Sequence, residues 1–482
     1  MSGNRNLIVK SILWKLTERT SVQIVIFIVT IILARLISPQ EYGLIAIVLV
    51  FISIANVIVD GGLNSALIQK KDADQVDFST IFYSSLMLSL FLIILLYFSA
   101  PFIAIFYDKE ELTLIIRVLS ISLFFYAANS IQRAYISRHL LFKQLFICSI
   151  VTAVITGTVC IVMAWNGYGV WALVTQTILS QVTTTIVMFI TVKWYPTLVF
   201  SVKRFKTLFN FGWKIFLTNF IISIFNNIRS LIIGKVYSPS ALAYFERGKQ
   251  FPTLIIDNIN ASVQAVLFPV FSNNQENKEA ILNMVRRSVK VNSYILFPIM
   301  TGLIVLAKPL ILCLLTNMWS DAIPFVRIFG IALMLLPIQI ANLEAVKSLG
   351  YSNVTLKLEV FKKIIEVVIL VITIPLGVKA IAWGMVVYNL ISLFINLKPT
   401  KDLLGYSVSE QIHDILPYFA LSGAMALCVS VVYLIFDSAM PQLVFGILVG
   451  IVSYVLISIL TKNESYEYVL GMLLKRKEKM HD

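Results

Sequence analysis

Seven basic side chains lie within or at the edges of long apolar runs, and the five other than Lys15 and Lys308 are the residues of the sequence best placed to do chemistry. They are Arg19, Arg117, Lys214, Arg229 and Arg327. An ionised side chain at the centre of a membrane-spanning helix costs at least about 2.5–3.5 kcal/mol on insertion scales. Such a residue is expected to face a wet cavity or to pair with another polar group. All five are therefore candidate binding residues.

An ordinary structural explanation stays open for four of the five. Arg19 lies near the start of the first apolar run, and residues 20–37 alone are about long enough to cross, which would leave Arg19 among the headgroups. Lys214 occupies the corresponding place in a repeat described below and shares that alternative. Arg117 and Arg327 lie close enough to one end of their runs to extend towards the interface. Arg229 lies deeper, beside a polar patch, and is the strongest candidate.

Two acidic residues are placed to pair with these basic side chains. Asp257 lies at about the depth of Arg229 on the next, antiparallel run, which predicts an Arg229–Asp257 ion pair. Contact of Arg229 with a substrate is the alternative. Asp60 is predicted to meet Arg19 in the same manner, and the two glycines that follow Asp60 predict a helix kink or a close helix approach. A substrate role of Asp60 is the alternative.

A third acidic candidate, Glu366, lies in a charged segment at the start of another apolar run. With Glu359, Lys362 and Lys363 it is predicted to form two ion pairs between residues four apart, which would neutralise one another. A role for Glu366 in ion coupling is the alternative.

Enzymatic and metal-dependent chemistry finds no support among the remaining residues. The three histidines, His139, His413 and His481, lie in loops and the tail, and the four cysteines lie inside apolar runs without C-x-x-C spacing. The sequence has no G-x-x-x-x-G-K-[ST] run, which excludes ATP hydrolysis by a P-loop in this chain. We expect no catalytic residue, no metal site and no cofactor.

The elements that must position these residues are membrane-spanning helices. Of the 482 residues 59% are hydrophobic and 13% are charged, against about a quarter charged in soluble proteins. Continuous apolar runs of about 20 residues are typical of membrane helices, whereas barrel strands alternate over about ten. The sequence predicts an all-α polytopic membrane protein with fourteen spans, near 14–37, 42–68, 80–101, 112–136, 145–165, 168–192, 209–236, 249–271, 290–314, 322–346, 356–375, 378–397, 416–436 and 441–461.

Lysine and arginine fall mainly on one set of the loops between these spans. One side of the membrane carries 26 of them, both termini included, and the opposite side about six. Because positively charged loops are retained in the cytoplasm, this alternation predicts that both termini are cytoplasmic. It also accounts for most of the net charge of +14, so the basic composition does not indicate nucleic-acid binding.

An internal repeat divides the predicted spans into two related sets. The segment from Trp14-Lys15 to Ser38-Pro39 recurs from Trp213-Lys214 to Ser238-Pro239, and Arg117 matches Arg327 at an offset of 210. Six spans followed by six related spans imply two pseudo-symmetric lobes that can rock around a central cavity, which is alternating access. The predicted domains are an N-terminal lobe at 1–208, a C-terminal lobe at 209–400, and two additional spans with a basic tail at 401–482.

A resemblance to a known family is carried by two stretches, ILARLISPQEYGL at 32–44 and VDGGLNSALIQ at 59–69. They resemble the amino-terminal signature of bacterial polysaccharide flippases. The sequence is similar in particular to the Wzx-type O-antigen flippases, in the branch of colanic-acid and teichuronic-acid exporters. That branch belongs to the multidrug/oligosaccharidyl-lipid/polysaccharide (MOP) superfamily. The likeness extends over nearly the whole chain in span count and repeat layout.

The resemblance implies translocation of an undecaprenyl-diphosphate-linked oligosaccharide across the bacterial inner membrane, for capsule, exopolysaccharide or O-antigen synthesis. It also implies a cationic central cavity, and the five basic residues are assigned to it because arginine forks and lysine charges suit phosphate. Asp60, Asp257 and Glu366 are kept as ion-pair or coupling residues. The expected partners are the lipid-linked oligosaccharide and the lipid bilayer, with a polysaccharide polymerase as a further candidate.

Three alternative functions remain. A cation-coupled multidrug exporter of the same fold should carry acidic residues within its helices to bind cations, whereas the interior of this chain is net basic. A lipid II flippase is a second alternative, which complementation of its loss would separate. A membrane-embedded polymerase or glycosyltransferase would need a long extramembrane loop or a soluble domain, and the predicted loops are too short for one.

Overall fold

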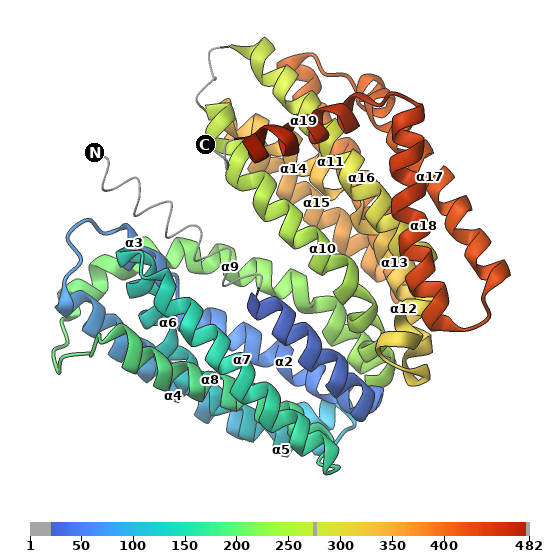
Figure 1. The fold of residues 1–482 in the computed structure, drawn as a ribbon. Coiled ribbons are helices and arrows are strands. Elements are labelled where there is room, and N and C mark those ends of the chain that lie inside the picture. The colour runs from blue at the N-terminus through green and yellow to red at the C-terminus, as the bar shows by residue number, and fades with distance from the viewer. Residues whose placement is uncertain (1–20, 273–276, 479–482) are drawn as a thin grey trace. The chain divides into compact units, whose positions relative to one another are not determined.

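The computed structural model describes residues 21–272 and 277–478, and within these ranges the chain is helical, without a β-strand. It divides into two compact units, unit 1 at Met1–Ala243 and unit 2 at Tyr244–Asp482. Figure 1 shows the helices of both units, and each unit is described by itself. The predicted lobe boundary at 208/209 follows the sequence repeat rather than the packing, and it stays a prediction.

Unit 1 is a bundle of long helices joined by short connections. Its helices are Ser21–Leu36, α2 (Pro39–Asp60), α3 (Leu63–Gln69), α4 (Gln75–Tyr107), α5 (Glu111–Ser120), α6 (Ser122–His139), α7 (Phe142–Trp165), α8 (Val170–Val192) and α9 (Val202–Val236). The first turn of α10 (Pro239–Ser272) also belongs to unit 1. Helices α7 and α8 pack against each other, and α9 packs against α2, α3 and α4.

Residues of the amino-terminal signature fix the start of α2. The Ser38 hydroxyl accepts a hydrogen bond from the Glu41 amide, and the Glu41 carboxylate accepts one of 3.0 Å from the Ser38 amide. Pro39, at the first helical position, has no amide proton to leave unpaired. The other Glu41 oxygen accepts a hydrogen bond of 3.0 Å from the amide of Val170, at the start of α8. Glu41 therefore joins two connections at one end of unit 1.

We expect Glu41→Ala to destabilise the protein by about 1–2 kcal/mol, because the helix cap and the bond to Val170 are lost together. Glu41→Gln keeps one side-chain oxygen and should be milder. Thermal unfolding of the purified protein measures both. Glu111→Ala, at an exposed position in the first turn of α5, is the matched control. Equal melting of Glu41→Ala and wild type would contradict this role.

The repeat-related helices α2 and α10 begin in direct contact within unit 1. Ser238 caps α10 as Ser38 caps α2, and its hydroxyl accepts a hydrogen bond of 3.1 Å from the Ala241 amide. A Cβ atom on Gly43 would lie 1.8 Å from the carbonyl oxygen of Pro239, so only glycine fits there. The two Ser-Pro pairs of the repeat thus have the same local role.

The predicted spans at 112–136 and 322–346, which contain Arg117 and Arg327, are each broken into two helices. In unit 1, α5 ends at Ser120 and α6 begins at Ser122. In unit 2, α13 (Ile323–Leu333) is followed after two residues by α14 (Leu336–Ser348). The first break begins four residues after Arg117 and the second begins seven residues after Arg327, so the matched spans break at similar but not identical places.

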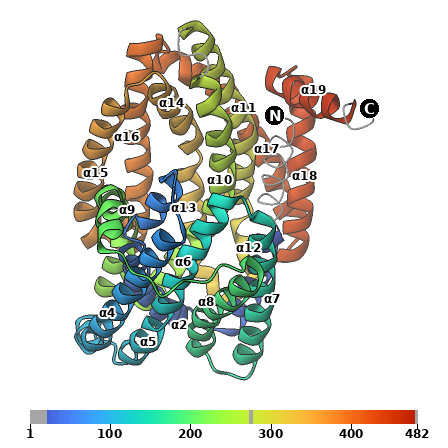
Figure 2. The same cartoon turned by 90° about the vertical axis from the view of Figure 1, so that its left-hand side faces the viewer.

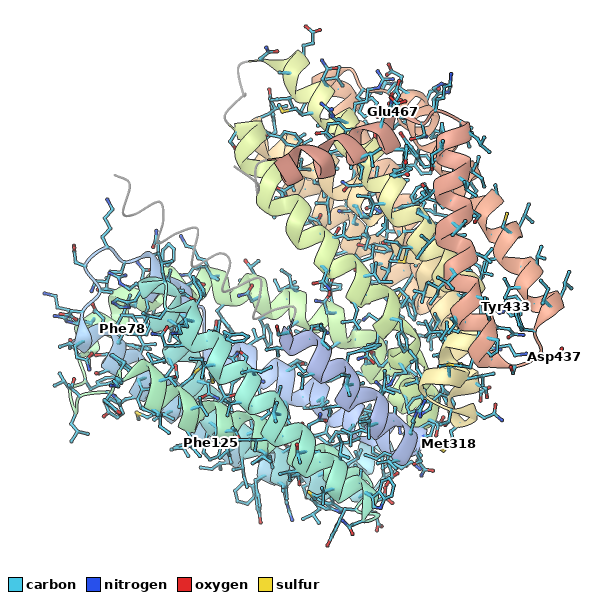
Figure 3. All side chains as sticks on the ribbon, viewed as in Figure 1. Phe78, Phe125, Met318, Tyr433, Asp437 and Glu467 are labelled. Atoms are coloured by element: carbon cyan, nitrogen blue, oxygen red, sulfur yellow. The ribbon has the colours of Figure 1, made fainter. Side chains whose placement is uncertain are left out.

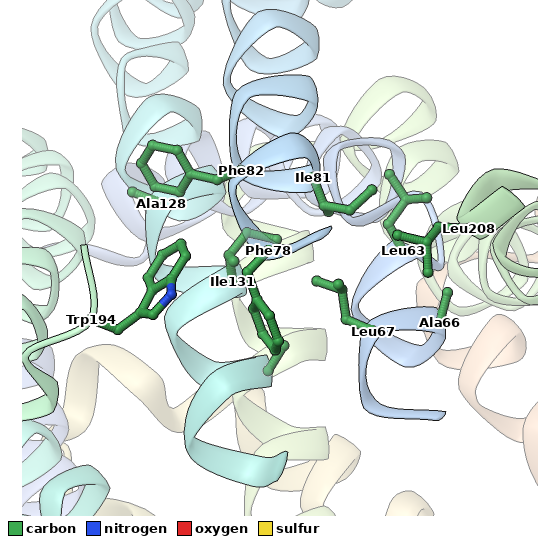
Figure 4. Close-up of a cluster of buried hydrophobic side chains, with 11 residues drawn as sticks. Leu63, Ala66, Leu67, Phe78, Ile81, Phe82, Ala128, Ile131, Trp194 and Leu208 are labelled. Carbon is green, nitrogen blue, oxygen red and sulfur yellow. The ribbon is translucent and has the colours of Figure 1, made fainter. Parts of the chain in front are cut away.

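A cluster of apolar side chains forms the core at one end of unit 1, where α3, α4, α6 and α9 meet the loop after α8 (Figure 4). Trp194 supplies the largest side chain, and its indole Nε1 donates a hydrogen bond of 2.6 Å to the Gln75 side chain. The Trp194 carbonyl accepts a hydrogen bond of 3.0 Å from the Gln132 side chain. The loop is thereby held against the bundle through both its apolar ring and its backbone.

Unit 2 is a second helical bundle. It contains the rest of α10, then α11 (Lys278–Val305), α12 (Ala307–Leu314), a 3₁₀ turn at Asn317–Ala322, α13, α14, α15 (Ser352–Thr373), a 3₁₀ turn at Ile374–Leu376, α16 (Val378–Leu404), α17 (Val408–Ile435), α18 (Ala439–Leu460) and α19 (Glu464–Glu478). Helices α14 and α15 both pack against α16, and Figure 2 shows these three side by side.

Polar contacts at both ends of α17 attach it to unit 2. Tyr433, near the carboxyl end of α17 in Figure 3, donates a hydrogen bond of 2.7 Å to the Val305 carbonyl. Near the other end the buried Asp414 carboxylate accepts hydrogen bonds from Arg286 at 2.5 Å and from the Tyr406 hydroxyl at 2.8 Å. The two helices predicted after the second lobe are therefore integral to this bundle.

Eleven helices among the described residues are long and apolar enough to cross a membrane. The other three predicted spans coincide with the helix Ser21–Leu36, with α10 and with α15. Helix Ser21–Leu36 is short where it is described, and α10 and α15 carry several charged side chains. The all-helical membrane fold is confirmed. The eleven helices are compatible with the fourteen predicted spans, and the number fourteen stays a prediction.

Candidate functional site

Unit 1 encloses a polar cavity of about 410 Å³. It lies between the helix Ser21–Leu36 and helices α6, α7 and α8. Hydroxyl and amide side chains dominate its lining: Ser149, Thr152 and Thr156 from α7, and Gln176, Thr177, Ser180, Gln181 and Thr184 from α8. Val22, Ile26 and Val29 contribute an apolar wall, and Arg133 of α6 completes the cavity.

The helical period places these side chains on facing surfaces of α7 and α8. The polar residues of α7 recur at intervals of three or four, as do those of α8, so each set forms one stripe. Gly157 of α7 lets the helix Ser21–Leu36 approach α7 closely, because a Cβ atom on Gly157 would lie 2.5 Å from Cγ2 of Val29. Small side chains bring the helices together while short polar groups leave space between them.

Part of the polar lining is already hydrogen-bonded within the protein. The hydroxyls of Thr152 and Thr184 lie 3.3 Å apart, and Asn129 donates a hydrogen bond of 2.9 Å to the Gln181 side chain. By contrast, within the described ranges the Gln176 amide and the Ser180 hydroxyl make no hydrogen bond to protein. Their donors and acceptors are available to a ligand.

Thr156 carries a further unused group. Its side chain is 4% exposed, and its hydroxyl has no hydrogen-bond partner among the described residues. Buried polar groups are normally paired, so an unpaired hydroxyl in the wall of a cavity requires an explanation.

Arg133 brings the only charge to the described lining of this cavity. Its side chain is exposed, and it forms no ion pair with an acidic residue in the described part of the chain. Arg133 lies six residues before the end of α6, which is about 9 Å along the helix axis. Arg133 is one of the 26 basic residues that the topology prediction assigns to the cytoplasmic side, and the structure places it beside the cavity.

Of the five predicted cavity residues, Arg117, Lys214 and Arg229 are described in unit 1 and Arg327 in unit 2, and their grouping in one cavity stays a prediction. Arg117 packs against Tyr97 of α4, with its guanidinium carbon 4.4 Å from the ring centroid and its Nε donating to the Tyr97 carbonyl at 3.3 Å. Lys214 is exposed on α9, and no acidic residue of the described ranges pairs with it. Arg229 is 9% exposed on the same helix. Arg19 lies outside the described residues.

Asp60 occupies a helix break that holds α3 against α9. Asn64 donates a side-chain hydrogen bond to the Asp60 carboxylate. Gly61 and Gly62 both adopt left-handed backbone conformations, and a Cβ atom on Gly62 would lie 2.2 Å from the Gly212 carbonyl oxygen. The predicted kink and the predicted close approach are both confirmed. The predicted contact of Asp60 with Arg19 falls outside the described residues.

The remaining candidates lie in unit 2. Arg327 is exposed on α13, near enough to Tyr433 to act on it electrostatically. Asp257 lies on α10, in a different unit from Arg229, and the predicted ion pair between them stays a prediction. Glu366 is 5% exposed and pairs with Lys363 at 2.7 Å.

The charged segment of α15 pairs in a different register from the one predicted. Lys362 pairs with Glu359 at 2.5 Å, so both ion pairs join residues three apart rather than four. Spacings of three and four both bring side chains together on a helix, and the sequence does not decide between them.

Unit 2 contains an apolar cavity of about 410 Å³ between α10, α11, α12, α17 and α18. Gly302, Gly446 and Gly450 line it and leave room where larger side chains would project. Its described lining is almost wholly hydrocarbon, in contrast to the polar cavity of unit 1. A charged head group would lose its hydration there without replacement.

Comparison with known sequences gives a family match and several relatives. A family model described as "Polysaccharide biosynthesis protein" matches residues 32–324. The chain is 25% identical to the teichuronic acid biosynthesis protein TuaB of Bacillus subtilis, over 77% of this chain and 78% of TuaB. It is 21% identical to the succinoglycan biosynthesis transport protein ExoT of Rhizobium meliloti, over 98% and 97%. It is 22% identical to the lipopolysaccharide biosynthesis protein WzxC of Escherichia coli, over 80% of each.

Solved structures share the fold at low sequence identity. The lipid II flippase MurJ in an inward closed conformation matches with a TM-score of 0.74 at 17% identity, over 94% of this chain and 99% of MurJ. An inward-facing MATE family transporter of the MOP superfamily matches with a TM-score of 0.58 at 17% identity, over 79% and 93%. These neighbours are a flippase and a transporter, and at this identity they show that the fold is shared.

Proposed function

The chain belongs to the polysaccharide biosynthesis protein family, and we propose that it moves an undecaprenyl-diphosphate-linked oligosaccharide across the bacterial inner membrane. The oligosaccharide would pass from the cytoplasmic to the periplasmic leaflet, for assembly into capsule, exopolysaccharide or O-antigen. A polysaccharide polymerase would receive it there. Relatives named for teichuronic acid, succinoglycan and lipopolysaccharide biosynthesis support a carbohydrate cargo.

The observation that carries this proposal is the charge balance of the spanning helices. Arg133, Lys214 and Arg327 form no ion pair with an acidic residue in the described ranges, whereas acidic side chains such as Asp77, Glu344 and Asp414 do pair with cations. Cations without an acidic partner on spanning helices suit an anionic cargo. A diphosphate cannot cross about 30 Å of hydrocarbon unaided at a useful rate, since it would lose its hydration.

We assign the diphosphate to a positively charged path through the protein. The residues assigned to this path are Arg19, Arg117, Lys214, Arg229 and Arg327. Arg229 is the strongest single candidate, because it is buried within a spanning helix and a guanidinium can bind phosphate through two parallel hydrogen bonds. Opening of this path to each side of the membrane in turn would move the head group while the polyprenyl chain stays in lipid.

Charge-removing substitutions test the assignment. We expect Arg229→Gln to reduce surface polymer strongly in a host that depends on this gene, and combined substitution of the assigned cations to abolish it. Lys109→Gln, in the connection between α4 and α5, is the control for lowering the net charge alone. Stable insertion of each variant is verified by quantifying the protein in membranes. Normal polymer from the combined variant would overturn the assignment.

The same charge balance weighs against a cation-coupled multidrug exporter, which would need free carboxylates inside its helices. Glu359 and Glu366 are ion-paired, and Asp60 accepts a hydrogen bond from Asn64. A lipid II flippase is distinguished by complementation. The chain should restore polymer export to a strain without its oligosaccharide flippase, and it should not support growth of a strain depleted of its lipid II flippase.

A further inference from the structure

We propose that the polar cavity of unit 1 binds the sugar of the lipid-linked substrate, and that Arg133 binds an anionic group adjoining that sugar. This inference rests on the proposed function and deepens it. It assigns the carbohydrate to a place inside the first bundle and adds Arg133 to the residues that contact substrate.

The lining has the chemistry that a sugar ring requires. Hydroxyl and amide groups both donate and accept hydrogen bonds, and so do sugar hydroxyls. No carboxylate occurs among the described lining residues, so nothing there would attract an inorganic cation. Eight of the fourteen lining residues are serine, threonine or glutamine, and a polyprenyl chain would offer their polar groups no hydrogen-bond partner. A volume of about 410 Å³ lies within the range of small-ligand sites, about 300–1,000 Å³.

The unused polar groups show where such a ligand would bind. Gln176 and Ser180 offer side chains that make no hydrogen bond to described protein groups, and both line the cavity from α8. On the facing helix, Thr156 carries a hydroxyl without a partner. Binding of a sugar would give all three groups partners that the described protein groups do not supply.

Arg133 supplies a charge that a neutral sugar does not need. A guanidinium beside a hydroxyl-lined cavity fits a sugar with a negative group next to it, through charge-assisted hydrogen bonds. The group is either the diphosphate attached to the first sugar or an acidic substituent on the glycan. The chemistry at Arg133 is the same for both, and two probes distinguish them.

Thr156→Val separates a binding role from a structural one. It removes a hydroxyl that has no partner, so the folded protein loses no hydrogen bond, and we expect its thermal stability to match or slightly exceed that of wild type. Sugar binding should nevertheless weaken at least tenfold in combination with Ser180→Ala. Thr183→Val, a buried threonine of α8 outside the cavity, is the matched control and should bind as wild type does.

The probes come from the lipid-linked pool of the host that encodes the protein. Mild acid releases the oligosaccharide without its diphosphate, and the intact lipid-linked form is the second probe. Binding of each to the full chain in lipid nanodiscs is measured by calorimetry. We expect the released oligosaccharide to bind the wild type and to bind the double variant at least tenfold more weakly. Equal binding of the released oligosaccharide to wild type, double variant and control would overturn the cavity assignment, as would its failure to bind the wild type.

Arg133→Gln completes the test. If the diphosphate lies at Arg133, the variant binds the intact lipid-linked form more weakly and the released oligosaccharide normally. If an acidic sugar lies there, both probes weaken. Unchanged binding of both would overturn the role of Arg133.

A flipping measurement in vesicles keeps the two proposals apart. Transport of the lipid-linked form by wild type, with no effect of the cavity substitutions on binding or transport, would refute the sugar site and leave the proposed function standing. No transport by wild type would refute the proposed function itself.

Discussion

Gly62→Ala is expected to destabilise unit 1 by several kcal/mol and to prevent accumulation of folded protein. Two costs act together at this residue. A backbone φ of +69° disfavours any residue with a Cβ atom, by about 1–2 kcal/mol. The added Cβ would also lie 2.2 Å from the Gly212 carbonyl oxygen and 2.9 Å from the Phe216 amide nitrogen. Both are backbone atoms of α9, so relief requires movement of a whole helix, and overpacking typically costs about 1–3 kcal/mol.

Gly61→Ala is the control for the backbone conformation alone. Gly61 has a φ of +53°, and the nearest atom to its added Cβ would be 3.5 Å away, an ordinary contact. Only the conformational cost applies, so we expect a loss of about 1–2 kcal/mol. Comparison of the two variants by size-exclusion chromatography and thermal unfolding measures the difference. Equal stabilities would show that the contact between α3 and α9 contributes nothing.

Asp77→Ala is the second substitution with a large expected effect. The Asp77 side chain is fully buried, and its carboxylate pairs with Lys70 at 2.7 Å and with Arg204 at 3.3 Å. It also accepts a hydrogen bond of 3.1 Å from the Asp74 amide. Removing one partner of a buried ion pair costs about 3–5 kcal/mol. Lys70 and Arg204 are each about one third exposed, so water would partly solvate the stranded cations, and we expect a loss of about 2–3 kcal/mol.

Asp72→Ala provides the matched control, because Asp72 is an exposed carboxylate in the same connection. It should change stability by less than about 0.5 kcal/mol. Arg204 also donates a hydrogen bond to Asp74, which lowers the pKa of Asp74 to about 2. Asp77→Ala therefore leaves Arg204 one acidic partner. Unfolding at neutral pH measures the effect, and a stability equal to that of Asp72→Ala would rule out the proposed ion-pair contribution.

Composition and hydropathy were sufficient to predict the architecture. A run of about 20 apolar residues has few structural solutions in a membrane, because every backbone polar group must be hydrogen-bonded within the helix. The Gly61-Gly62 break was also predictable, because consecutive glycines permit both the left-handed backbone and the close approach. The breaks after Ser120 and Leu333 were missed, since no glycine occurs at either position to mark them.

The polar cavity was not predictable from the sequence. Serine and threonine at helical spacing are as typical of tight helix packing in membranes as of a binding site. Only the structure shows that α7 and α8 leave space between their polar stripes instead of filling it. Arg133 was overlooked because it lies near the end of a span, where a cation normally indicates topology.

The signature stretches have a structural basis that the resemblance alone did not reveal. Ser38, Glu41 and Gly43 begin α2 and hold its neighbours, and they do so without contacting the polar cavity. These residues report the fold of the family rather than its cargo. The five cations assigned to transport lie elsewhere in the chain, and their role depends on the proposed experiments.

The packing of α9 bears on how such a chain could have arisen. By the repeat, α9 opens the second copy, yet it covers a face formed by α2, α3 and α4 of the first. A half-length ancestor would have left that face bare unless a twin chain contributed the missing helix.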